Sequence, residues 1–189
     1  MQEKQRLYIY AFISTIFTDV MNEKLIDELR ENKELLNMIS NEALDWFEKT
    51  SNDELKELLN IDFNSLFLMN SVPVESFVMD DKDEVQVGLQ NPVMQFYFSN
   101  GYELNLTSSK VNSPDHIAIE CAFMQNLVQK NEKKVQIKFL ENHLLKWAPI
   151  YFLGLKDMAK TPFYKDLCDF IAEFLIADYD YLMSINFES

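Results

Sequence analysis

The sequence predicts an all-helical protein of about eight to ten helices. Bulky residues are plentiful and turn-forming residues scarce, with 15 Phe against three Gly and five Pro among 189 residues. The hydrophobic share of 48% can fill a sizeable core and is too high for a disordered chain. Apolar residues recur at helical spacing along most of the chain, whereas the alternation at 84–87 is too short to found a sheet.

Helix signals place the individual elements. Ser40, Ser51 and Asp62 can each cap a helix, and Thr161 before Pro162 combines a cap with a proline at the first helical position. The expected helices lie at 5–20, 23–36, 40–47, 51–59, 62–69, 90–100, 114–130, 134–147 and 161–183, with a kink or restart at Pro149 before 150–158.

Two segments interrupt this helical pattern. Residues 71–78 contain a proline and lack periodicity, which predicts a loop. Phe67 and Phe77 flank this loop, and they serve either as a peptide-contact surface or as ordinary anchors of the loop. Residues 105–113 are polar and form the expected hinge or linker. The chain would then comprise an N-terminal helical part at 1–104, with the contact loop at 71–78, and a C-terminal helical part at 114–189.

The segment 113–124 contains the clearest candidate chemistry. Ser113 and Pro114 suit the N-cap and the first position of a helix, which would place Asp115 in its first turn. His116 and Glu120 are four residues apart and would share a face. Asp115, His116 and Glu120 could therefore act as a general acid and base. On spacing alone, a capping aspartate and a hydrogen bond along the helix are the more common explanation.

Other kinds of site find little support. The sequence contains no glycine-rich phosphate loop, no GxSxG motif and no HExxH motif. A metal site would have to combine His116, Glu120 and His143, which is fewer than the four ligands usual for structural zinc. We therefore expect no metal and no cofactor. Cys121 and Cys168 lie on apolar stripes and are expected to be small buried hydrophobes in a reducing compartment.

The charge and the hydropathy limit the partners and the location. The net charge of −14 disfavours nucleic acid, because binding to phosphates requires clustered Lys and Arg. It is compatible with a basic partner such as a cationic peptide, or it only keeps the protein soluble. Residues 7–20 do not resemble a signal peptide, and no apolar stretch reaches the length of a membrane span. We therefore expect a soluble cytoplasmic protein without stable membrane insertion.

Three motifs in a fixed order resemble the TorD/DmsD/NarJ family of redox-enzyme maturation chaperones. They are Asp62-Phe63-Asn64-Ser65-Leu66-Phe67 followed by Pro73-Val74-Glu75-Ser76, then Pro114-Asp115-His116-Ile117 with Glu120 and Phe123-Met124, and finally Phe139-Leu140 with His143-Leu144-Leu145-Lys146-Trp147. Two positions depart from the family pattern, Val74 before the Glu-Ser pair and Cys121 after Glu120. These departures bear on which subfamily the chain resembles, and not on its resemblance to the family.

The resemblance implies a fold and a function. The family fold is a single helical domain in two lobes joined by a hinge, which agrees with the polar stretch at 105–113. Family members are non-enzymatic and bind the basic N-terminal twin-arginine leader, or another part, of an apo molybdopterin oxidoreductase precursor. They assist cofactor insertion and delay export until the enzyme is mature. The residues carried over to the leader-binding region are Leu66, Phe67, Pro73, Glu75, Ser76, Asp115 and His116.

Two other functions remain open at this point. The chain could be a small hydrolase that uses Asp115, His116 and Glu120, or a helical adaptor for an unrelated partner. Turnover would separate the hydrolase from the others, and an Arg-Arg leader on the partner would separate the chaperone from the adaptor. A monomer and a domain-exchanged dimer both fit the sequence.

Overall fold

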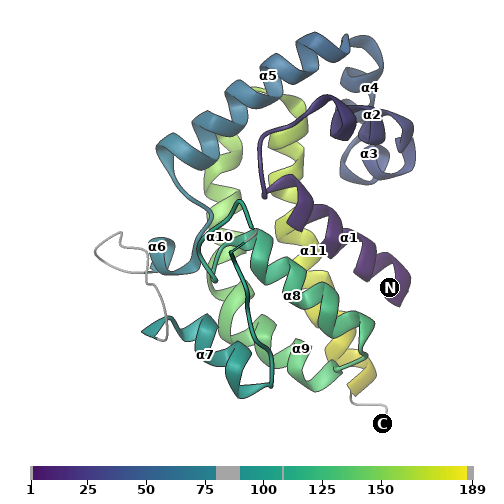
Figure 1. Cartoon of the computed structure of the whole chain (residues 1–189). Helices are drawn as coiled ribbons and strands as arrows, with labels where there is room; N and C mark the ends of the chain where they lie inside the picture. The colour runs from purple at the N-terminus through teal and green to yellow at the C-terminus, as the bar shows by residue number, and fades with distance from the viewer. Residues whose placement is uncertain (1, 80–89, 108, 187–189) are drawn as a thin grey trace. The chain divides into compact units, whose positions relative to one another are not determined.

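The computed structural model describes residues 2–79, 90–107 and 109–186, and the all-helical class is confirmed within these ranges (Figure 1). The only strand-like pairing there is an isolated antiparallel bridge between Val74 and His116. The predicted alternation at 84–87 lies outside the described residues. The helices are α1 (Glu3–Ile16), α2 (Glu23–Glu31), α3 (Lys33–Ile39), α4 (Asn41–Lys49), α5 (Asn52–Asn64), the π-helix η1 (Ser65–Asn70), α6 (Glu75–Met79), α7 (Pro92–Ser99), α8 (Ile117–Gln129), α9 (Lys133–Phe139), the π-helix η3 (Leu140–Leu144), α10 (Leu145–Leu155), the 3₁₀-helix η4 (Lys156–Met158) and α11 (Pro162–Asn186).

Several predicted helix starts are confirmed by their hydrogen bonds. The side chain of Ser40 accepts from the amide of Ala43 to cap α4, and the side chain of Ser51 accepts from the amide of Glu54 to cap α5. Helix α11 begins at Pro162, as predicted. A short polar side chain accepts from an amide group that a helix leaves unpaired at its first turn, and a proline at the first position has no amide to leave unpaired.

Three predicted boundaries are wrong, and the loop predicted at 71–78 is helical in part, because Glu75–Met79 form α6. The helix expected over 23–36 is divided at Asn32, whose side chain accepts from the amide of Leu35 and caps α3. Asp62 does not cap a helix but lies inside α5, where its carboxylate accepts from the amides of Lys160 and Thr161. Pro149 does not restart a helix, because α10 continues through it, and the kink expected as the alternative stays a prediction. Proline at the fifth residue of a helix removes a single backbone hydrogen bond, and this helix buries residues on both sides of it.

The described chain forms two compact units. Unit 1 comprises Met1–Asp19, Pro73–Ile150 and Glu173–Ser189, and unit 2 comprises Val20–Val72 and Tyr151–Ala172. The segment expected as a hinge, 105–113, lies within unit 1. The division of the chain at that segment stays a prediction.

Unit 2 has an aromatic core. The ring of Phe67 lies 5.6 Å from that of Tyr164 and 6.5 Å from that of Phe152, and the ring of Phe47 lies 5.4 Å from that of Phe163. All five side chains are buried. This core fixes the inner face of α5 and η1, because Phe67 belongs to η1.

In unit 1, a buried ion pair joins the two ends of the chain. Helix α1 packs against α8, and Arg6 of α1 pairs with Asp178 of α11. The guanidinium also donates to Gln136 at 2.6 Å, and the hydroxyl of Tyr10 donates to Asp178 at 2.8 Å. These partners compensate for removing two charges from water. Among the described residues, no helix is both long and apolar enough to cross a membrane.

Candidate functional site

Two of the sequence motifs meet through their backbones in unit 1. The amide of Glu75 donates to the carbonyl of Asp115, and the amide of Ile117 donates to the carbonyl of Pro73, both at 2.9 Å. These bonds flank the bridge between Val74 and His116. Segment 73–76 is therefore fixed to segment 115–117, although about 40 residues separate the two in sequence.

The carboxylate of Asp115 caps α6. One of its oxygens accepts from the amide of Ser76 at 2.9 Å, and the other accepts from the hydroxyl of Ser113. The side chain is buried, with 1% of its surface exposed. The sequence analysis placed Asp115 in the first turn of a helix that begins at Ser113 and Pro114, and this placement is wrong. Asp115 lies before α8 because its backbone pairs with the 73–76 segment.

His116 is the N-cap of α8. Its Nδ1 accepts from the amide of Ala118 at 3.1 Å, which requires the proton of the neutral ring to lie on Nε2. Burial lowers the pKa of His116 to about 4, against an opposing effect of the Asp115 charge. The ring is therefore neutral at physiological pH and can keep its capping bond.

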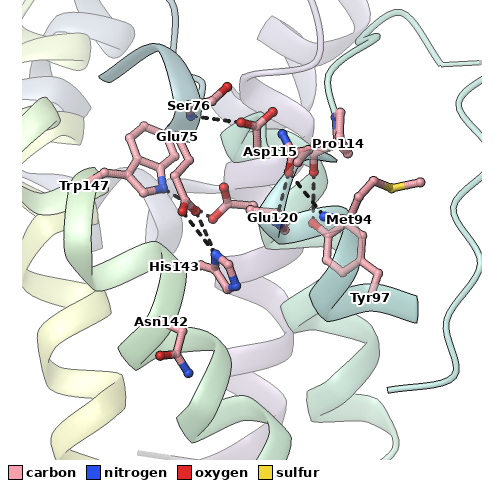
Figure 2. A network of polar contacts seen from close by, with 12 residues as sticks. Glu75, Ser76, Met94, Tyr97, Pro114, Asp115, Glu120, Asn142, His143 and Trp147 are labelled. Atoms are coloured by element: carbon pink, nitrogen blue, oxygen red, sulfur yellow. Dashed lines mark hydrogen bonds and ion pairs between the residues drawn. The ribbon is translucent and has the colours of Figure 1, made fainter. Parts of the chain in front are cut away.

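The side chain of Glu75 points from α6 to His143 of η3 (Figure 2). Both carboxylate oxygens lie 3.1 Å from Nδ1 of His143, and both side chains are largely buried. The imidazole is also held between aromatic rings, 5.2 Å from the centroid of Phe96 and 5.1 Å from that of Phe139. This contact attaches the first turn of α6 to the core of unit 1.

Glu120 lies beside this pair and is fully buried. Its Oε2 accepts a long hydrogen bond of 3.4 Å from the indole of Trp147, and its Oε1 has no partner among the described residues. Burial raises the pKa of Glu120 well above its usual range, and the nearby charges of Glu75 and Asp115 raise it further. Burial and the neighbouring carboxylates therefore both favour the neutral form of the Glu120 carboxyl group.

Tyr97 of α7 is the last member of this group of buried side chains. Its hydroxyl donates to the carbonyl of Pro114 at 3.0 Å. Burial raises the pKa of Tyr97 well above its usual range, so the phenol stays protonated and keeps this bond. We call the set Glu75, Ser76, Tyr97, Asp115, Glu120, His143 and Trp147 the α6 cluster.

The α6 cluster is built to hold a short helix in place. Asp115 and His116 each satisfy backbone amides, and Glu120 faces Trp147 without access to solvent. The three groups of the proposed acid–base trio therefore do not converge on an open site. Within the described ranges, no three His, Cys, Asp or Glu side chains are placed to hold a metal ion.

The structure brings together five of the seven predicted leader-binding residues, which are Pro73, Glu75, Ser76, Asp115 and His116. Leu66 and Phe67 belong to unit 2, where both side chains are fully buried. Sequence reasoning did not find that His143 is the partner of Glu75, or that Glu120 is the partner of Trp147.

These features define an all-helical protein in which an acidic, buried cluster fixes a short helix. The chain belongs to the family described as the nitrate reductase delta subunit, which matches residues 22–152. The resemblance drawn from the three motifs is thereby confirmed.

The chain is also similar to curated proteins named Chaperone protein TorD. The relative from Aliivibrio salmonicida is 23% identical and that from Vibrio atlanticus 26% identical, and in both cases 95% of each chain is covered. The relative from Salmonella bongori is 30% identical over 44% of this chain and 40% of its own length. These relatives are named chaperones and not enzymes, which agrees with the prediction of a non-enzymatic protein.

Proposed function

We propose that the protein is a cytoplasmic chaperone for a molybdopterin oxidoreductase. It binds the twin-arginine leader, the apo form of the precursor, or both, assists cofactor insertion and delays export until the enzyme is mature. The observation that carries this proposal is the similarity to TorD chaperones over 95% of both chains. The charge of −14 supports it, because a basic leader is attracted to an acidic protein.

The leader-binding region is proposed to be shaped by the seven motif residues, Leu66, Phe67, Pro73, Glu75, Ser76, Asp115 and His116. The burial of Leu66, Phe67, Ser76 and Asp115 supports a role in holding that region rather than in touching the peptide. Asp115 would contribute by holding α6 in place. The buried side chains of Leu66 and Phe67 would contribute by holding the exposed residues of η1 in place.

Titration calorimetry with synthetic twin-arginine leaders of molybdoenzymes tests this function. We expect saturable binding that weakens as salt rises, because exposed charges are screened beyond a Debye length of about 8 Å at physiological ionic strength. A scrambled peptide of the same composition is the control for charge alone. Equal binding of leader and scrambled peptide, or no binding of either together with no copurifying apo-enzyme, would refute the proposal.

A further inference from the structure

The outer face of α5 and η1 carries an exposed apolar stripe in unit 2. Its members are Leu58, Ile61, Leu68 and Met69, with 38%, 52%, 56% and 82% of their surfaces exposed. Leu58 and Ile61 are three residues apart in α5, and Leu68 and Met69 are adjacent in the π-helical turn that continues it. Soluble proteins rarely group large apolar side chains in this way without a partner. We call these four residues the outer stripe.

The π-helical turn explains why so many apolar residues face outward here. Leu66 and Phe67 are both fully buried, and Phe67 packs on Tyr164 and Phe152. These two inward side chains leave Leu68 and Met69 on the opposite side. The outer stripe is therefore fixed by a well-packed core beneath it, and π-helical turns are frequent at functional sites.

The N-terminal end of the same face is acidic. Asp53, Glu54 and Glu57 are exposed, and Glu54 and Glu57 lie one turn before Leu58 and Ile61. The cation on this segment, Lys56, is paired with Glu23 at 2.8 Å, so it does not neutralise the acidic end. The face thus changes from negative to apolar along its length.

We infer that the outer stripe with its acidic end is a docking surface for a peptide segment that is basic at one end and apolar after it. Charge complementarity selects this occupant, since Lys or Arg would meet Glu54 and Glu57 and apolar side chains would cover Leu68 and Met69. A second copy of this chain would place like charges together if it packed in parallel, and it would cover the apolar end with carboxylates if it packed antiparallel. The inference rests on the proposed function only for the source of the segment, which is the client's leader.

The length and the direction of the surface make the inference specific. From Asp53 to Met69 the helix axis advances about 20 to 25 Å. An extended peptide of about seven residues covers that distance. The basic end of the peptide lies over residues 53–57 and its apolar end over residues 68–69.

The test measures leader binding to matched variants by titration calorimetry. Leu68→Ser with Met69→Ser should weaken the leader's Kd about tenfold or more, because two apolar contacts are lost. The control is Leu153→Ser with Met158→Ser, which changes the same residue types in the same unit at 45% and 47% exposure and should bind as wild type does.

Charge variants and crosslinks test the direction. Glu54→Gln with Glu57→Gln should weaken binding about three- to tenfold at low salt and little at high salt, whereas Glu34→Gln with Glu42→Gln should not. The native cysteines are buried, so an introduced thiol can be addressed alone. With diamide added as the thiol oxidant, we expect Met69→Cys to form a disulfide with a leader thiol at the apolar end, and Glu57→Cys with one beside the arginines.

The outcomes separate this inference from the proposed function. Loss of binding in the Leu68/Met69 variant and not in its control supports the surface. Leader binding by wild type that both stripe and charge variants retain would overturn the surface and leave the proposed function standing. A wild-type dimer that the stripe variant dissociates, with leader affinity unchanged, would assign the stripe to a second copy. No leader binding by the wild-type protein would overturn both.

Discussion

Replacing Glu120 with glutamine tests whether the α6 cluster holds a neutral carboxylic acid. The pKa of Glu120 is raised well above its usual range, first by burial and then by the charges of Glu75 and Asp115. In the unfolded chain the same group loses its proton near its ordinary pKa of about 4.5. Between these two values the native state binds one proton more than the unfolded state, so stability falls as pH rises.

The size of the effect follows from this linkage. Each pH unit within that window removes up to about 1.4 kcal/mol of unfolding free energy. Glutamine has nearly the same shape and cannot ionise, and its amide oxygen can still accept from the indole of Trp147. The Glu120→Gln protein should therefore match wild type at pH 5 to within about 1 kcal/mol and become progressively more stable than wild type at pH 6, 7 and 8.

Urea unfolding followed by circular dichroism at these pH values measures the difference. Glu42→Gln removes an exposed carboxyl group and is the control. Its unfolding free energy should change with pH in the same way as that of wild type. If the difference between Glu120→Gln and wild type stays constant from pH 5 to 8, Glu120 is ionised in the folded protein and the reasoning is refuted.

Three further predictions concern other parts of unit 1. Asp115→Ala should cost about 1–3 kcal/mol of stability and speed hydrogen exchange at the amide of Ser76, while Asp115→Asn costs less because it keeps an acceptor; unchanged exchange in the alanine variant would contradict the capping role. Arg6→Met should lower the unfolding free energy by about 3–5 kcal/mol, since it leaves Asp178 buried without its cation; a melting temperature equal to wild type would refute this. The ring of His116 should titrate near pH 4 by NMR, and stability should fall as pH drops from about 6.5 towards 4, because the unfolded state takes up the proton first; a midpoint above 6 would contradict its burial.

Local signals predicted the fold well because they act within one turn of a helix. Ser40, Ser51 and Pro162 were correctly assigned as helix starts, since a capping side chain or a proline needs only its immediate neighbours. Asp62 is also of a type that often caps helices, but it has a different role here. Its carboxylate accepts hydrogen bonds from the amides of residues 160 and 161 instead of from the first turn of a helix. Contacts across about 100 residues leave no pattern in a single sequence.

The candidate site shows the same limit more strongly. Ser113 and Pro114 have good helix-start chemistry, yet α8 begins at Ile117 because the 73–76 segment pairs with the residues before it. The pairing of Glu75 with His143 joins a short helix to a π-helix, and neither element has a reliable sequence signal. The motifs identified the residues that matter, and the structure was needed to show which of them meet.

The ion pair between Arg6 and Asp178 has a consequence for how the protein is made. The two residues are 172 positions apart, and unit 1 is built from the first, middle and last stretches of the chain. During synthesis α1 emerges long before the carboxylate that neutralises its arginine. Closing so long a loop carries an entropic cost that only the completed packing of α1 on α8 and α11 can offset.

Unit 1 therefore completes its core only after α11 has been made, whereas unit 2 needs residues 151–172 to complete its own. A ribosome-bound chain that stops before residue 178 exposes Ile9 and Ile13 of α1 without a finished core to receive them. A protein proposed to guard an unfinished enzyme thus cannot finish folding unit 1 until α11 has been made.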